Sequence, residues 1–205
     1  MTRLHDYWRS SASYRVRIAL ALAGIEWQAA PVDLTTGAQR DPDYLAVNPQ
    51  GLVPTLEIDG DRFTQSLAIV EYLNETRALG LLPEAPADRA HVRALAQAIA
   101  VDIHPVCNLR VAKHAVAASN GAITMESWMQ TFIAPGLAAV EEMISGESFC
   151  WRDQLTLADL CLVPQIYNAR RWGIDLAPMP NITRIAAHLE TLPAFAAARP
   201  APPAA

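Results

Sequence analysis

Residues 1–80 alternate between strand-like and helix-like patterns, and this alternation constrains the fold more than any other feature of the sequence. A short strand is expected over residues 4–8. From Tyr14, apolar residues recur with helical spacing up to a C-cap at Gly24. A second strand is expected over residues 27–32, so the chain opens with a strand–helix–strand unit.

The same part of the chain continues with a second, different unit. One or two helical turns are expected over residues 41–47, ended by an Asn-Pro pair. Strands over residues 55–58 and 62–64 flank Asp-Gly-Asp, which is turn chemistry typical of a hairpin. A helix capped by Ser66 follows. The order is therefore βαβ and then αββα.

The remainder of the chain is almost entirely helical in pattern. Pro83 and Pro86 mark the boundary with the first part. We expect a kink at Pro105, because proline removes a backbone hydrogen bond, and fraying of the Pro/Ala-rich tail from Arg199. Helical stretches are expected over residues 88–119, 124–144, 156–172 and 182–192.

The composition limits the partners and the compartment. With 52% apolar and 18% charged residues, a chain of 205 residues can bury a sizeable core. The net charge of −5 argues against nucleic acid and polybasic membrane binding, so an anionic ligand requires a local cluster of arginines. No apolar run reaches the ~20 residues of a membrane span. Three cysteines without CxxC spacing, and no secretory leader, predict a reduced cytoplasmic protein.

The segment RSSASYR, residues 9–15, lies between the first expected strand and the first expected helix. Hydroxyls at a helix start lie among unpaired backbone N–H groups and at the positive end of the helix dipole, where an anion such as a thiolate is stabilised. The alternative is that Ser11 or Ser13 only caps the helix. The spacing alone favours the cap.

The segment NPQGLVPTL, residues 48–56, contains a proline that opens a strand after an exposed loop. This makes Val53–Pro54 a candidate cis peptide bond, although most such bonds are trans. A cis bond would turn the Val53 N–H and C=O outward, where a peptide-like ligand can pair with them as an extra strand.

Gln65 and Ser66 lie where a short strand leads into a helix. The Ser66 hydroxyl and the first N–H groups of the helix form a second candidate anion site, suited to a carboxylate. The alternative is again a helix cap. Each of these signals is weak alone, and their joint order along the chain strengthens them.

Taken together, these segments resemble the zeta class of glutathione transferases, which contains maleylacetoacetate isomerases and maleylpyruvate isomerases. The resemblance runs through essentially the whole chain. The Arg-Ser-Ser and DIHP…NLR segments are specific to this class, whereas VPTL and the TLAD helix start are shared by most glutathione transferases. The segments that carry it are RSSASYRVRIAL, NPQGLVPTL, TQSLAIVEYL, DIHPVCNLRV and TLADLCLVPQIYNARRWGIDL.

The resemblance implies a glutathione transferase fold: a thioredoxin-like α/β domain (βαβ-αββα, mixed sheet), then an all-α helical bundle. On this basis the predicted domains are residues 1–82 for glutathione binding, residues 88–199 for the substrate, and a tail at 200–205. Glutathione is the implied cofactor. The implied partners are a small dicarboxylate substrate and a second copy of the chain in a homodimer, with neither nucleic acid nor membrane.

The resemblance also implies roles for individual residues. Ser10 matches the serine whose hydroxyl supports the glutathione thiolate, and Ser11 is its neighbour at the helix start; these two are the predicted catalytic residues. Val53 matches the residue whose backbone pairs with the cysteinyl part of glutathione, ahead of the cis proline, Pro54.

The remaining implied contacts concern carboxylates and the pocket lining. Gln65 and Ser66 match the pair that holds the γ-glutamyl carboxylate. Arg171 matches the family position better than its neighbour Arg170. The pocket-lining positions are Gln39, His104, Asn108 and Arg110, and the arginines expected to face the substrate carboxylates are Arg9, Arg110 and Arg171.

Two positions depart from the family pattern. Ala12 stands where the family motif usually has cysteine, which removes a thiol that the isomerisation does not need. The Trp-Arg-Asp segment at residues 151–153 has Arg152 where glycine is common, and we expect this to alter a turn and leave the chemistry unchanged.

The implied reaction is a cis–trans isomerisation in aromatic catabolism, converting maleylacetoacetate to fumarylacetoacetate or maleylpyruvate to fumarylpyruvate. Glutathione supplies a thiolate that adds reversibly to the double bond. His104 and Arg110 favour the maleylpyruvate enzymes mildly. One alternative is a transferase or dehalogenase acting on small electrophiles such as α-haloacids. Another is a binding or scaffold protein without turnover, which the intact thiolate site argues against.

Two further groups have structural interpretations. His104 either acts on a substrate oxygen or satisfies backbone groups freed at Pro105. The spacing of His104 and Cys107 hints at metal ligands, but two groups do not make a four-ligand site, so no metal is expected. Asp159 is interpreted as half of a capping box with Thr156 and not as a catalytic residue.

Overall fold

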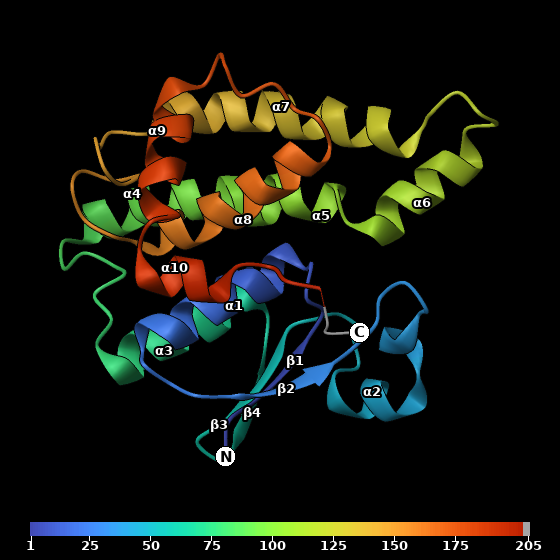
Figure 1. Cartoon of the computed structure of the whole chain (residues 1–205), viewed down its shortest axis with the longest axis horizontal. Coiled ribbons are helices and arrows are strands. Elements are labelled where there is room, and N and C mark those ends of the chain that lie inside the picture. The colour runs from blue at the N-terminus through green and yellow to red at the C-terminus, as the bar shows by residue number, and fades with distance from the viewer. Residues whose placement is uncertain (203–205) are drawn as a thin grey trace. The chain divides into compact units, whose positions relative to one another are not determined.

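The computed structural model describes residues 1–202 and divides the chain into two compact units (Figure 1). The first holds Met1–Gly80 together with the chain from Leu192 onward, and the second holds Leu81–Thr191. The last three residues of the predicted tail, 203–205, lie outside the described residues.

The first unit is built on a four-stranded mixed sheet, as predicted. Its elements are β1 (Arg3–Asp6), α1 (Ser11–Leu22), β2 (Gln28–Pro31), the 3-10 turn η1 (Ala38–Arg40), α2 (Pro42–Val47), β3 (Thr55–Ile58), β4 (Asp61–Thr64), α3 (Ser66–Arg77) and α10 (Pro193–Ala198). The strand order is β2-β1-β3-β4; β1 runs parallel to β2 and antiparallel to β3. Leu4 of β1 pairs with Ala29 on one side and Leu56 on the other, so β1 is central.

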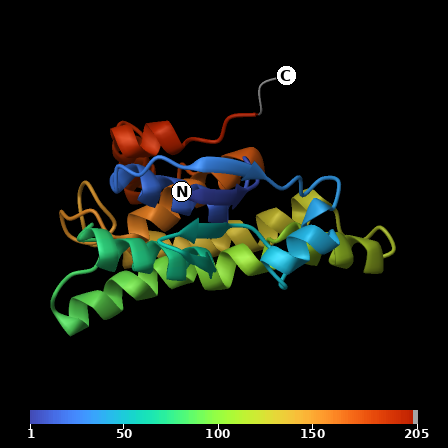
Figure 2. The same cartoon turned by 90° about the horizontal axis from the view of Figure 1, so that it is seen from below.

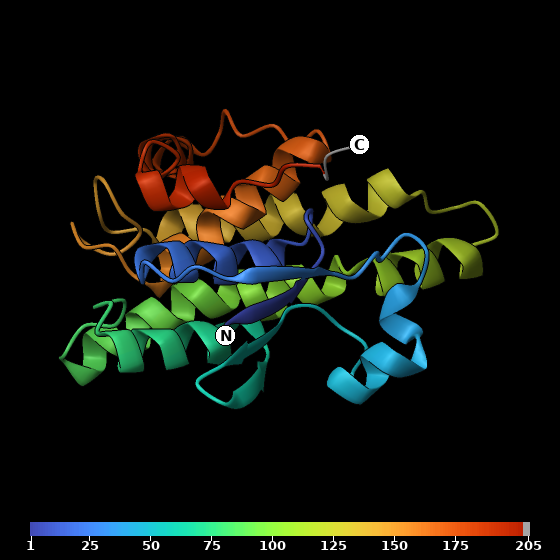
Figure 3. The same cartoon turned by 60° about the horizontal axis from the view of Figure 1, so that its bottom comes forward.

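Helix α1 is buried along most of its length, from Ser11 to Leu20. It packs against α3 and α10, and Figures 1 and 3 show it running between these two helices. A helix covered on several sides does not show a one-sided apolar stripe, and its arginines must find partners inside the protein. The start of α1 is therefore fixed by packing as well as by its own hydrogen bonds.

The C-terminal helix α10 was not predicted, and it belongs to the first unit. The expected helix over 182–192 is instead α9 (Pro180–Leu189), after which the chain crosses to α1. Tyr14 and Arg17 of α1 donate hydrogen bonds to the carbonyls of Phe195 (3.4 Å) and Ala198 (3.0 Å). The predicted second domain, 88–199, therefore extends past the end of the observed second unit.

The second unit is helical throughout its regular elements. No helix within residues 1–202 combines the length and the apolar character that crossing a membrane requires. The elements are α4 (Pro86–Gln97), the π-helical turn η2 (Ala98–Ile103), α5 (His104–Val106), α6 (Leu109–Ala118), α7 (Met125–Met143), α8 (Leu157–Arg171) and α9.

The single helix expected over 88–119 is broken into four pieces. Helix α4, η2 and α5 follow one another along one line in Figures 1 and 2, and α6 starts afresh at Leu109. The kink expected at Pro105 is not found there: Pro105 lies within α5, the helix ends only after it, at Cys107, and the backbone widens into the π-helical turn before it. Gly136 of α7 faces this turn: a Cβ there would lie 2.5 Å from Ile103 Cγ1, so only glycine permits the close approach.

The predicted capping box at the start of α8 is confirmed. The Asp159 carboxylate accepts hydrogen bonds from the Thr156 N–H (2.7 Å), the Thr156 hydroxyl (2.9 Å) and the Cys150 N–H (2.7 Å). Burial raises the pKa of Asp159, and these hydrogen bonds oppose the shift. All of its partners are structural, which agrees with the non-catalytic interpretation.

Arg152, the position where the family has glycine, adopts a left-handed backbone conformation with φ of 50°. Its side chain forms an exposed ion pair with Asp88 at 3.0 Å. Such a pair contributes little, about 0–1 kcal/mol, whereas a left-handed conformation costs a residue with a Cβ about 1–2 kcal/mol.

We therefore predict that the Arg152→Gly variant is more stable than Arg152→Ala by about 1 kcal/mol, because both lose the ion pair and only glycine relieves the backbone. Chemical denaturation of the two variants measures this difference. An alanine variant at least as stable as the glycine variant would contradict the interpretation.

Candidate active site

The start of α1 holds Ser10 as its N-cap, and neither Ser11 nor Ser13 takes this position. The Ser10 Oγ accepts a hydrogen bond from the Ser13 N–H at 3.2 Å. The hydroxyl proton is donated to no residue among 1–202, so Ser10 caps the helix and keeps a donor for a second partner. The cap interpretation is confirmed for Ser10, and its remaining donor leaves the anion-site interpretation open for the same residue.

Arg9 precedes this cap and is held by aromatic side chains. Its Nη2 donates to the Tyr7 hydroxyl at 3.2 Å, and its Cζ lies 5.1 Å from the centroid of the Trp8 ring. Within the described residues it forms no ion pair with a carboxylate. A half-buried guanidinium of this kind is available to an anionic ligand.

The loop before β3 presents the backbone of Val53. The Val53–Pro54 bond is cis, as the family resemblance implies. Tyr44 and Asn48 both donate to the Leu52 carbonyl, at 2.6 and 2.8 Å, and hold the loop in place. Neither the N–H nor the C=O of Val53 forms a hydrogen bond with any residue in 1–202, so both are available to an extended ligand.

The start of α3 differs from the expected cap. Gln65 takes the N-cap position with φ of 66°, and its exposed side chain donates to the Gln50 Oε1 at 2.9 Å. Ser66 is the first helical residue and makes no capping hydrogen bond, so the cap interpretation of Ser66 is wrong. Its buried Oγ accepts instead from Arg15 Nη1 at 3.1 Å.

Gln39 lies in η1, beside the loop that carries Val53. The two segments meet at Gly51, which has φ of +60° and whose Cβ, if present, would lie 2.7 Å from the Gln39 carbonyl oxygen. The Gln39 side chain is half-buried, and its Oε1 is enclosed with no hydrogen-bond partner among the described residues. The backbone of Gln39 is therefore close to the loop that carries Val53, and its side chain keeps an unsatisfied acceptor.

Three of the predicted residues lie together in the second unit. His104 begins α5 and is half-buried. Asn108 is the N-cap of α6, and its Oδ1 accepts from the Arg110 N–H at 3.0 Å. The exposed guanidinium of Arg110 forms no hydrogen bond or ion pair with any residue of the described chain, so no protein group neutralises its charge.

The end of α8 distinguishes Arg171 from Arg170. Arg170 Nη1 is 2.5 Å from the Glu190 carboxylate and is thereby neutralised. The Arg171 guanidinium lies over the Trp172 ring, 4.8 Å from its centroid. The preference for Arg171 over Arg170 as the ligand-facing residue stays a prediction.

Comparison with known proteins identifies the family. Residues 9–76 match the family described as glutathione S-transferase, N-terminal domain. A maleylacetoacetate isomerase of Rhizobium meliloti is 56% identical over 204 residues, covering 97% of this chain and 96% of that protein. The chain belongs to the zeta-class glutathione transferases, among the maleylacetoacetate isomerases.

Two solved structures extend the comparison. A maleylpyruvate isomerase, described as a bacterial zeta-class glutathione transferase, superposes with a TM-score of 0.91 at 37% identity, covering 97% of this chain and 96% of that one. A maleylacetoacetate isomerase of Methylobacterium extorquens with bound malonate and glutathione gives a TM-score of 0.90 at 40% identity, covering 97% and 96%. The thioredoxin-like fold of the first unit is thereby confirmed.

The first unit of this zeta-class chain fits glutathione in its chemistry. A tripeptide with a thiol, an internal peptide and a carboxylate needs a donor for sulfur, a free backbone edge and a donor for oxygen. The unit contains groups of these three kinds: Ser10 and Ser66 each keep a hydroxyl proton, and Val53 keeps an unpaired backbone N–H and C=O. Among the described residues no group of three or more His, Cys, Asp and Glu side chains is placed to hold a metal ion.

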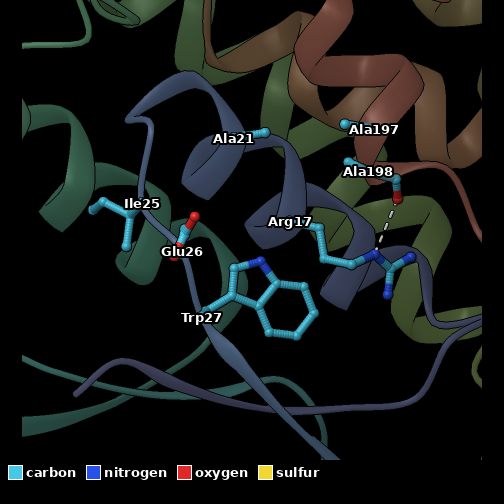
Figure 4. Close-up of a pocket in the computed structure, with 7 residues that line it drawn as sticks. All are labelled: Arg17, Ala21, Ile25, Glu26, Trp27, Ala197 and Ala198. Carbon is cyan, nitrogen blue, oxygen red and sulfur yellow. Dashed lines mark hydrogen bonds between the residues drawn. The ribbon is translucent and has the colours of Figure 1, made fainter.

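Figure 4 shows a cavity of about 420 Å³ in the first unit, bordered by α1, α10 and residues 25–27, which precede β2. None of the predicted site residues lines it. Its cation, Arg17, donates to Asp6 (2.6 Å) and to the carbonyls of Trp8 and Ala198 (3.0 Å each). Because these partners occupy the guanidinium, Arg17 is not available to an anion in this cavity.

The sequence interpretation missed Arg15. It belongs to the RSSASYR segment, yet the resemblance gives it no role. The available signal was its place on a helix among the apolar residues Val16, Ala19 and Leu20, where an arginine must be buried.

All three thiols of this zeta-class chain are free and buried, and Ala12 leaves none at the start of α1. Burial raises the pKa of Cys107 to about 11 and also raises that of Cys150. At pH 8 a thiol with this pKa is ionised in about one molecule in a thousand.

We predict that iodoacetamide labels Cys107 in the native protein at pH 8 more than about a hundredfold more slowly than a free cysteine, with the rate rising as the pH approaches 11. Mass spectrometry of time points measures the rate, and the unfolded protein, in which all three cysteines react, is the control. Rapid labelling of the native protein with loss of activity would contradict it.

Proposed function

We propose that the protein is a glutathione-dependent cis–trans isomerase of an unsaturated dicarboxylic oxo acid in aromatic catabolism. The candidate reactions are maleylacetoacetate to fumarylacetoacetate and maleylpyruvate to fumarylpyruvate. Bound glutathione supplies the sulfur nucleophile that adds to the conjugated double bond and leaves after rotation. The observation that carries the proposal is that Ser10 and Ser66 each accept a hydrogen bond from the protein and retain a proton for an anion.

In this proposal the first unit holds and activates the thiol. The Ser10 hydroxyl donates to the thiolate, and the first-turn N–H groups of α1, beginning at Ser11, stabilise its charge. The Val53 backbone, ahead of Pro54, pairs with the cysteinyl peptide group. The catalytic residues are therefore Ser10 and Ser11, and the lowered thiol pKa is their contribution.

The other residues bind the remaining groups. Gln65 and Ser66 hold the γ-glutamyl carboxylate, at the N-terminus of α3. Further glutathione contacts fall to Gln39, His104, Asn108 and Arg110. The substrate carboxylates are proposed to bind to Arg9, Arg110 and Arg171, since guanidinium groups hold carboxylates in bidentate geometry and stabilise a developing enolate. Arg9 and Arg110 support this because neither pairs with a carboxylate in residues 1–202.

We also propose a homodimer of two-domain subunits, a glutathione-binding domain and a helical substrate domain, in the cytoplasm. The whole-length similarity to zeta-class enzymes supports the domain roles. The three free cysteines fit a reducing compartment, where disulfides do not persist.

The proposed function is tested by following the absorbance of freshly generated maleylacetoacetate and maleylpyruvate, each with and without glutathione. We expect conversion only with glutathione, and the two rates rank the substrates. Absence of conversion of both, with glutathione still bound, would replace the proposal by a transferase or dehalogenase acting on small electrophiles such as α-haloacids.

A second prediction concerns Arg110. Replacing it with Met should raise the KM for the dicarboxylate about tenfold or more, because a charge-assisted hydrogen bond is lost, and should leave the KM for neutral chlorodinitrobenzene within about twofold. Arg170→Met is the matched control, since Arg170 is already paired with Glu190, and it should behave as wild type. An equal effect of Arg110→Met on both substrates would contradict carboxylate binding.

A further inference from the structure

Arg15 is a charged residue buried in the first unit, with 2% of its surface exposed. It lies one turn after the start of α1, and its side chain reaches the first residue of α3. Arginine is seldom fully buried, because removing its charge from water costs several kcal/mol unless polar groups compensate. A position of this kind calls for a reason beyond packing.

The contact with Ser66 determines what the Ser66 hydroxyl can do. Arg15 Nη1 lies 3.1 Å from the Ser66 Oγ, and a guanidinium can only donate, so the serine oxygen is the acceptor. A hydroxyl has one proton and two lone pairs. The Ser66 proton is therefore directed away from Arg15, and no residue among 1–202 accepts it.

The surroundings favour an anion as the acceptor of that proton. Ser66 is 7% exposed, so few orientations of its hydroxyl reach solvent. The first N–H groups of α3 carry partial positive charge, and the Arg15 guanidinium adds a full positive charge at hydrogen-bond distance from the same oxygen. In a buried setting this field is screened less than it would be at the surface.

We propose that Arg15 is a positioning residue for carboxylate recognition: it holds the Ser66 hydroxyl so that its proton faces the α-carboxylate of the γ-glutamyl group, and thereby confers selectivity for thiols that carry this carboxylate. The inference rests on the proposed use of glutathione and deepens it. Arg15 touches neither the sulfur nor the substrate in this account, and it acts through Ser66.

Arg17 provides a matched control on the same helix. It is also buried, with 7% of its surface exposed, but its donors go to Asp6 and to two backbone carbonyls, which are structural partners. Loss of Arg17 should therefore lower stability without changing the selectivity between thiols.

The experiment compares two thiols, glutathione and γ-aminobutyryl-cysteinylglycine, which lacks only the α-carboxylate. The selectivity is the ratio of kcat/KM for the two in the isomerisation assay, measured for wild type, Arg15→Met, Arg15→Lys, Ser66→Ala, Arg15→Met with Ser66→Ala, and Arg17→Met. Thermal unfolding of each variant records stability separately.

We expect Arg15→Met to lower the selectivity about tenfold, through a higher KM for glutathione, with the decarboxylated thiol affected within about twofold. Arg15→Lys keeps the charge and a donor, and should restore most of the selectivity. With Ser66→Ala already present, Arg15→Met should change the selectivity by about twofold or less, because the two residues act as one unit.

Equal losses for both thiols in Arg15→Met, or selectivity losses that multiply independently in the double variant, would overturn the role of Arg15. If Arg15→Met does not fold, the Arg15→Lys variant provides the test. A folded Arg15→Lys variant whose thiol selectivity is as low as that of Ser66→Ala would show that the positive charge at residue 15 does not position the Ser66 hydroxyl. Wild-type protein that prefers glutathione shows that the proposed function holds whatever the variants do, whereas wild type that turns over neither thiol overturns both proposals.

Discussion

A serine hydroxyl that is bound to the protein can still donate to an anion when the protein contacts its oxygen and leaves its proton free. This condition is met at the starts of α1 and α3, where the Ser10 oxygen accepts from the Ser13 N–H and the Ser66 oxygen accepts from Arg15. Both hydroxyls lie at helix N-termini, where partial positive charge gathers. The remaining parts of the first unit keep these two helix starts in place.

The topology explains how a short chain achieves this. Because β1 is the central strand and leads directly into α1, the start of α1 lies at the carboxyl end of the sheet, where open α/β sheets bind ligands. Helices α3 and α10 pack against α1, and Tyr14 and Arg17 fasten α10 to it through hydrogen bonds.

Ion pairs give several of the arginines a structural role. Six of the fifteen arginines are paired with carboxylates, namely Arg17, Arg62, Arg77, Arg152, Arg170 and Arg184.

Local patterns predicted most of the fold, and contacts between distant segments account for what they missed. Turn residues and apolar spacing located the four strands, α1 and α3 within a few residues. The helix α10 was missed because only its contacts with Tyr14 and Arg17 indicate where it belongs. The π-helical turn before Pro105 packs closely against Gly136, a contact between distant segments that no local pattern encodes.

The candidate site shows the same limit. The resemblance identified Ser10 and Ser66, but spacing could not tell which of three serines caps α1 or that Ser66 is no cap at all. The cap at Ser10 and the lack of a cap at Ser66 each depend on the direction of a single hydrogen bond. The role proposed for Arg15 rests on its contact with Ser66, 51 residues away, which no local pattern reveals.

The pKa of the thiol in the enzyme–glutathione complex tests the central claim most directly. Ultraviolet absorbance of the thiolate, followed against pH, measures it in wild type, Ser10→Ala and Ser10→Thr, the last of which keeps both hydroxyl and cap. The account predicts a wild-type value below that of free glutathione, a rise of about one to two units in Ser10→Ala, and little change in Ser10→Thr. The same thiol pKa in wild type and Ser10→Ala would contradict it.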